Sequence, residues 1–163
     1  MKQKLKALTT EMKENKTEEM KEIEEICCLE MKEIIFDSDC CDWEIYTSIF
    51  KKIVEKKKQL IFLIETETNK KFGCYIDSEI IINKWKYVVD PKAFIFSLDA
   101  NTIKKYNIIE YSKAIQIYPS NNDYLFEIGN YIEIMKHGLN KKSRWKSWNK
   151  TYNYEEEDFF NFF

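Results

Sequence analysis

Glycine, proline and histidine are scarce in this chain of 163 residues, which contains three, two and one of them respectively. A chain so poor in glycine has no phosphate-cradling loop of the P-loop or dinucleotide-binding type, which argues against nucleotide-dependent enzymes. No run of about 18 apolar residues is present to span a membrane, and no apolar signal core follows the charged start of the chain. The formal net charge of −2 gives no global basic field for nucleic acid. We therefore expect a cytoplasmic protein.

The rest of the composition is that of a folded domain. Apolar residues make up 44% and aromatic residues 15% of the chain, which separates it from disordered sequences. Its length suffices for one domain with a sizeable core and a short appendage. From the change in composition along the chain, we expect a charged helical extension over residues 1–28 and a domain over residues 29–163.

The stretch 59–77, QLIFLIETETNKKFGCYID, is predicted to form the centre of the fold. Its five consecutive apolar residues, 60–64, have no polar side, which is typical of a strand covered on both faces. A polar segment containing Asn69 follows, and the apolar pattern resumes at 72–76. Two such runs joined by a short polar loop predict an antiparallel hairpin.

Residues 1–26 are rich in lysine and glutamate and lack glycine and proline, which favours helix. Two apolar stripes fit helical faces, namely Leu5, Leu8 and Met12, and then Met20, Ile23 and Cys27. The heptad register breaks between the stripes, so we interpret the region as a solvated helix, with the end of a longer coiled coil as the alternative. Thr10 and Thr17 as helix caps would also allow two short helices.

Further elements are predicted from shorter patterns. A strand at 34–36 precedes an amphipathic helix from Trp43 to Glu55. Beyond the hairpin we expect strands at 94–98, 114–118, 124–128 and 131–136, weaker strand-like segments at 78–82 and 85–89, and a helical turn near 103–106. Gly129 and Asn130 predict a tight turn between the last two strands.

Five cysteines are present, and they include two adjacent pairs. An odd count with adjacent residues does not resemble a disulfide framework. Cys27, Cys28, Cys40 and Cys41 form the one conceivable zinc set, but structural zinc ligands usually have two to four residues between them. We expect no metal site, and mainly buried cysteines that behave as apolar side chains.

Candidate catalytic groups are few. His137, the only histidine, follows a predicted strand, and we interpret it as an exposed loop residue rather than a catalytic base. Asp37, Asp39 and Asp42 lie close together, but the mid-loop glycine and closing glutamate of a calcium loop are missing. Helix capping is therefore the expected role of Asp39 or Asp42. Carboxylates are numerous, but a single sequence does not show which of them converge in space. We predict no catalytic residue and no cofactor.

The segment 136–150, KHGLNKKSRWKSWNK, interleaves basic and aromatic residues. Such a pattern stacks on bases and follows phosphates, or lies at an anionic membrane surface. An acidic cluster at 155–158 can neutralise it, so an ordinary loop and strand is the competing interpretation. The candidate interaction surface consists of Lys141, Lys142, Arg144, Trp145, Lys146 and Trp148.

The succession of short blocks along the chain resembles the TLDc domain family, especially its short versions in amoebae. The blocks are EIIFDSD (33–39), SIF (48–50), KKQLIFLIE (57–65), NKKFGCY (69–75), FIFSL (94–98) and DYLFEIGNYIEIMK (123–136). Phe72 and Gly73 match the family's Phe-Gly step, and Gly129 matches a later glycine. Both glycines are expected as requirements of the backbone.

The resemblance implies an α+β fold, in which an antiparallel two-sheet β-sandwich is flanked by a few helices. It also implies a non-enzymatic module for protein interaction and regulation. Members of the family are linked to oxidative-stress resistance and to the vacuolar proton ATPase, whose subunits are then the expected partners. The family's final apolar strand is not evident here, and the aromatic residues 159–163 either replace it or leave an edge that needs a partner.

Two other functions compete with the one that the resemblance implies. The first is a nucleic-acid or anionic-membrane adaptor that works through Lys136–Lys150. The second is a hydrolase, which requires two carboxylates that converge in a cleft.

Overall fold

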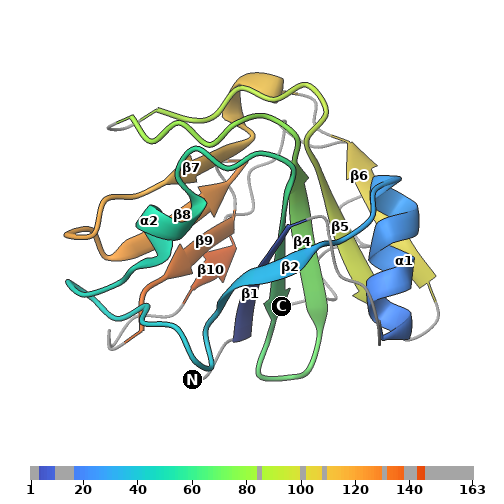
Figure 1. Cartoon of the computed structure of the whole chain (residues 1–163), viewed down its shortest axis with the longest axis horizontal. Coiled ribbons are helices and arrows are strands. Elements are labelled where there is room, and N and C mark those ends of the chain that lie inside the picture. The colour runs from blue at the N-terminus through green and yellow to red at the C-terminus, as the bar shows by residue number, and fades with distance from the viewer. Residues whose placement is uncertain are drawn as a thin grey trace.

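Two antiparallel sheets form the framework of the computed structural model, which describes residues 4–9, 17–83, 86–99, 102–107, 110–129, 132–137 and 143–145 (Figure 1). The first sheet has the order β2 (Glu33–Asp37), β1 (Lys4–Thr9), β3 (Leu60–Glu65), β4 (Lys71–Ile76), β5 (Phe94–Asp99) and β6 (Thr102–Asn107). The second has the order β10 (Arg144–Trp145), β9 (Ile132–Met135), β8 (Tyr124–Ile128) and β7 (Ile115–Ile117). The helices are α1 (Glu18–Cys27), α2 (Phe50–Val54) and the 3₁₀ turn η1 (Tyr111–Lys113). No helix among these residues is long and apolar enough to cross a membrane.

Both sheets contribute side chains to one main hydrophobic core. The rings of Phe62 in β3 and Phe126 in β8 lie 5.4 Å apart between the sheets. Helix α2 adds Phe50, whose ring stacks on Phe126 at 5.5 Å and meets Phe36 of β2 edge-on at 5.0 Å. The two-sheet arrangement that the family resemblance implies is confirmed. Helix α2 also connects the edge strand β2 to the second sheet.

Helix α1 covers the other face of the first sheet, where a second apolar cluster forms (Figure 1). Ile23 and Cys27 are buried there against Ile61 and Phe96. The helix begins at Thr17, whose side-chain oxygen accepts a hydrogen bond from the Met20 backbone at 3.3 Å, as an N-cap does. The predicted apolar stripe of this helix is confirmed, and it packs on the sheet.

The predicted central hairpin is also confirmed. Strands β3 and β4 pair in register from Leu60–Ile76 to Glu65–Lys71, and β1 and β5 flank them. The turn between them is closed by the Thr66 amide, which donates to the Lys70 carbonyl at 2.8 Å. Alternate β3 side chains enter the main core and the cluster under α1, so the strand is covered on both faces as its apolar run predicted.

The first part of the predicted N-terminal helical extension is wrong. Residues 4–9 form β1, which lies inside the first sheet between β2 and β3. Leu5 and Ala7 point into the main core with at most 1% of their surface exposed. Because alternate residues of a strand face the same side, this spacing suits a strand, and sheet pairing overrides the helix propensity of the neighbouring lysines.

Three shorter predictions also need correction. Only Phe50–Val54 of the predicted helix 43–55 is helical, and the preceding loop contains Tyr46 with a φ of 76°. The predicted helical turn near 103–106 is strand β6, which pairs along its length with β5. Residues 78–82 form no regular strand, although Ile80 exchanges backbone hydrogen bonds with Lys56 and Lys57.

Candidate site: a pocket between the 38–49 loop and His137

An open pocket of about 650 Å³ lies where the β2–α2 loop meets the end of β9. It is lined by residues 38–44, Thr47 and His137. In the sequence, its aspartates, cysteines and histidine were separate candidates, and each had an ordinary structural explanation. The fold brings Asp39, Asp42, Cys40, Cys41 and His137 to one place.

Hydrogen bonds within the loop fix the first half of the lining. The amides of Cys40 and Cys41 both donate to the Asp37 carbonyl, at 3.1 and 2.7 Å. One carboxylate oxygen of Asp42 accepts from the Glu44 amide at 3.0 Å and from the Thr47 hydroxyl at 3.1 Å. Asp42 therefore stabilises a turn. The helix-capping role predicted for it is wrong, because α2 begins after Ile49 without a side-chain cap.

His137 is attached to the same loop through its backbone and its ring. Its amide donates to the Trp43 carbonyl at 3.2 Å, and its carbonyl accepts from the Ile45 amide at 3.3 Å. The ring nitrogen Nδ1 lies 3.1 Å from a carboxylate oxygen of Glu44, and the ring lies 5.4 Å from that of Trp43. His137 is exposed, as predicted, but it is held in place by three neighbouring residues of the loop.

The pocket has the chemistry of an acidic surface with an aromatic wall. Asp39, Asp42 and Glu44 line it, and no lysine or arginine does among the described residues. Desolvation by the surrounding loop, a hydrogen bond with Cys41 and the neighbouring carboxylates raise the pKa of the exposed Cys40 thiol. At neutral pH this thiol stays protonated, and a protonated thiol is a poor nucleophile.

The zinc hypothesis finds no geometric basis in the described part of the chain. Cys27 is buried under α1, Cys74 is buried in the main core, and Cys28 and Cys40 are exposed. No three histidine, cysteine or acidic side chains in that part are grouped to hold a metal ion. The prediction that the cysteines are buried apolar side chains is confirmed for Cys27 and Cys74. It is wrong for Cys28 and Cys40, which are exposed.

The predicted basic and aromatic surface is described only in part. Lys141, Lys142, Lys146 and Trp148 lie outside the described residues. Arg144 and Trp145 form β10 and pair with Glu133 and Ile132 of β9, so their backbone belongs to the second sheet.

Lys136, the first lysine of this segment, has a structural role. It is buried, and its Nζ donates to three backbone carbonyls of the β7–β8 turn, those of Pro119, Ser120 and Asn122, at 2.6–3.0 Å. Burial lowers its pKa, and Asp123 partly opposes this effect. The ammonium group therefore holds the turn and is not offered to an anionic partner.

A pair of buried carboxylates, which no sequence pattern predicted, lies across β8 and β9. Glu127 and Glu133 are direct partners in the register, and each has 3% of its surface exposed. The Tyr118 hydroxyl donates to Glu127 at 2.6 Å, and Tyr87 also hydrogen-bonds Glu127. Neither glutamate lines the open pocket or the pocket under α1, so the pair does not supply a carboxylate site to either of them.

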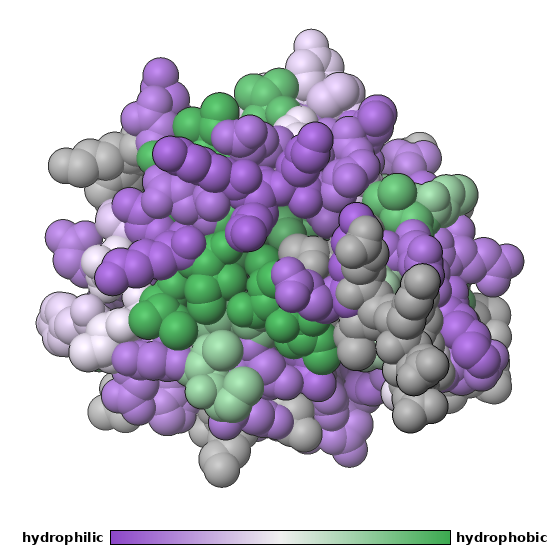
Figure 2. Space-filling view, viewed as in Figure 1, coloured by the Kyte–Doolittle hydropathy of each residue, from purple (hydrophilic) through white to green (hydrophobic). Residues whose placement is uncertain are grey.

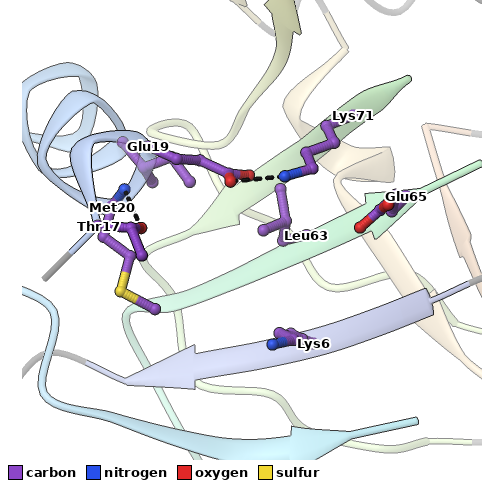
Figure 3. A pocket seen from close by; sticks show the side chains of 8 residues that line it. Lys6, Thr17, Glu19, Met20, Leu63, Glu65 and Lys71 are labelled. Carbon is purple, nitrogen blue, oxygen red and sulfur yellow. Dashed lines mark hydrogen bonds and ion pairs between the residues drawn. The ribbon is translucent and has the colours of Figure 1, made fainter. Parts of the chain in front are cut away.

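A second, smaller pocket of about 140 Å³ lies under the start of α1 (Figure 3). The Lys71 Nζ of β4 and a carboxylate oxygen of Glu19 in α1 form an ion pair across it at 2.6 Å. Leu63 and Met20 supply its apolar lining. The side chains that line it join the helix to the sheet, so we assign it to packing.

The residues that carry the family resemblance are structural. Phe72 is buried in the main core. A Cβ at Gly73 would lie 2.2 Å from the Phe62 carbonyl oxygen and 2.6 Å from the Phe96 ring, so only glycine fits between β3 and β5. Gly129 adopts a φ of 58° at the β8–β9 turn, where glycine is favoured.

Comparison with known protein families matches residues 42–161 to the TLDc domain. The match covers α2 and strands β3 to β10, and therefore most of both sheets. No curated protein and no solved structure matches the chain.

Proposed function

The chain belongs to the TLDc domain family, and from this membership we propose that it is a non-enzymatic module that binds another protein and regulates it. The observation that carries the proposal is the family match across both sheets. The pocket beside His137 supports it, because its lining combines charged and aromatic side chains at the surface without a nucleophile activated by a neighbouring base among the described residues.

In finer terms, we propose that the protein acts in the cytoplasm on the vacuolar proton ATPase, through contact with one or more of its subunits. A role in oxidative-stress resistance is the other function that the family suggests.

The test is to add the purified full-length chain to isolated vacuolar membranes. Proton uptake driven by ATP is then measured, together with co-sedimentation of the chain. We expect the chain to sediment with the membranes and to change the rate of proton uptake. If it neither sediments nor changes the rate, the ATPase role is refuted, and survival of peroxide by cells lacking the protein tests the stress role separately.

The adaptor function through Lys136–Lys150 stays a hypothesis with its own test. It predicts binding to anionic vesicles or single-stranded nucleic acid that weakens steeply as salt rises. Replacing Arg144, Trp145 and Trp148 by alanine would abolish that binding. Unchanged binding by the triple variant would remove the hypothesis.

A further inference from the structure

The pocket beside His137 adjoins an exposed apolar surface. The Ile49 amide donates to the Asp42 carbonyl at 3.0 Å, so the backbone of Ile49, a residue with 37% of its surface exposed, lies next to the backbone of the acidic lining. Tyr46, in the same loop, is 74% exposed. Figure 2 shows a continuous hydrophobic patch on this face, over the region between β2 and α2. The half-buried side chains of Ile35 and Ile53 belong to these two elements and pack on the main core.

The acidic groups beside this patch are held in position before any partner arrives. Asp42 is fixed by the Glu44 amide and the Thr47 hydroxyl. Glu44 is fixed by the His137 ring. A cationic side chain that enters the pocket therefore meets preorganised carboxylates, which reduces the entropy lost on binding.

From this combination we propose that the pocket and the adjoining patch bind a segment of a partner protein that presents an arginine or lysine next to apolar side chains. The inference rests on the proposed function as an interaction module, and it names the chemistry of the partner. An arginine suits the pocket best, because its planar guanidinium pairs with carboxylates in two directions and stacks on an aromatic face such as that of Trp43.

Other occupants fit the surface less well. A metal ion would leave the apolar patch without a role, and no three suitable ligands are grouped among the described residues. An apolar partner without charge would bury Asp39, Asp42 and Glu44 and bring no cationic group of its own to replace their hydration. A basic and apolar segment satisfies both halves of the surface.

The test uses a library of random peptides displayed on phage, selected on the immobilised full-length chain. Enriched peptides are then synthesised, and their binding is measured by fluorescence anisotropy. The pocket variant is Asp39→Asn with Asp42→Asn and Glu44→Gln, which keeps an oxygen acceptor for the Thr47 hydroxyl and for His137. The matched control is Glu25→Gln with Glu67→Gln and Glu79→Gln, which removes the same charge from three exposed positions outside the pocket.

We expect the selected peptides to share a basic residue beside apolar ones. They should bind the pocket variant at least about tenfold more weakly than the wild-type chain, and bind the control variant like the wild-type chain. Near-ultraviolet circular dichroism is used to check that both variants are folded.

Absence of enrichment, selected peptides without basic residues, or equal binding to the pocket variant would each overturn the proposal. Self-association of the wild-type chain that the pocket variant loses would assign the surface to a second copy and overturn it as well. The vacuolar-membrane assay and the peptide selection can fail independently. A negative result in the membrane assay alone removes the proposed ATPase partner. A negative result in the peptide selection alone removes only the assignment of this surface.

Discussion

Replacing Gly73 by alanine tests the close packing at the centre of the hairpin. The added methyl carbon would lie 2.2 Å from the Phe62 carbonyl oxygen and 2.6 Å from the Phe96 ring. Both distances are far below ordinary van der Waals contact. The substitution therefore requires movement of β3, of β5 or of both.

Neither neighbour can move cheaply. The Phe62 backbone lies in β3, which pairs with β1 on one side and with β4 on the other. The Phe96 ring is fully buried under α1. Overpacking of a core usually costs about 1–3 kcal/mol and more where the backbone must shift, whereas alanine stabilises relative to glycine by only about 0.4–1 kcal/mol through the unfolded state. From the upper end of the first range less the second, we expect a net loss of about 2 kcal/mol.

Urea unfolding followed by circular dichroism measures this loss, with Gly129→Ala as the matched control. Gly129 has a positive φ of 58°, so alanine there has a backbone cost of about 1–2 kcal/mol. Gly73→Ala should therefore be the more damaging of the two. A Gly73→Ala variant that unfolds within about 1 kcal/mol of the wild-type chain, with the same dependence on urea, would refute this account of the packing.

Three further predictions concern the sheets. Lys136→Met should lose about 1–3 kcal/mol in urea unfolding, because the carbonyls of the β7–β8 turn lose their shared donor; unchanged stability would contradict the structural role of Lys136. Burial and the hydrogen bond to Glu127 raise the pKa of Tyr118, so its stabilising contribution is complete below the unfolded tyrosine pKa of about 10 and is lost as the pH rises beyond it. The wild-type chain should therefore lose more melting temperature between pH 8 and pH 11 than Tyr118→Phe does, and equal losses would count against the effect. Deletion of residues 1–9 should produce an aggregated or unfolded chain by size-exclusion chromatography and circular dichroism, because β1 lies inside the first sheet; a folded monomer would show that this strand is dispensable.

The parts of the fold that the sequence predicted well are those with strong local patterns. The apolar run of β3 and the alternation in β5 and β8 identify strands without knowledge of their partners. Ser97 shows the limit of such patterns, because it is fully buried on β5 although its hydroxyl gives no apolar signal. Local periodicity identified the strands, and the detailed burial depended on their neighbours.

The predictions that were wrong concern segments whose structure depends on distant partners. Residues 4–9 consist mostly of good helix formers, and only pairing with β2 and β3 makes them a strand. The loop before α2 has a helical apolar period, but hydrogen bonds to Asp42 and the bridge between Glu44 and His137 hold it in turns. In both cases contacts between residues far apart in sequence outweighed the local preference.

The candidate pocket could not be predicted from the sequence for the same reason, and this bears on its proposed use. His137 and Glu44 are 93 positions apart, and the register of β9 decides whether they meet. Taken singly, an exposed histidine, a turn of aspartates and an exposed isoleucine each have a common structural explanation. Placed together, they form an acidic pocket with an apolar border. The carboxylates of the pocket and the apolar side chains of the border are both exposed to solvent, and a basic and apolar protein segment can cover them at once. The acidic and apolar halves of this surface are joined where the Ile49 amide donates to the Asp42 carbonyl.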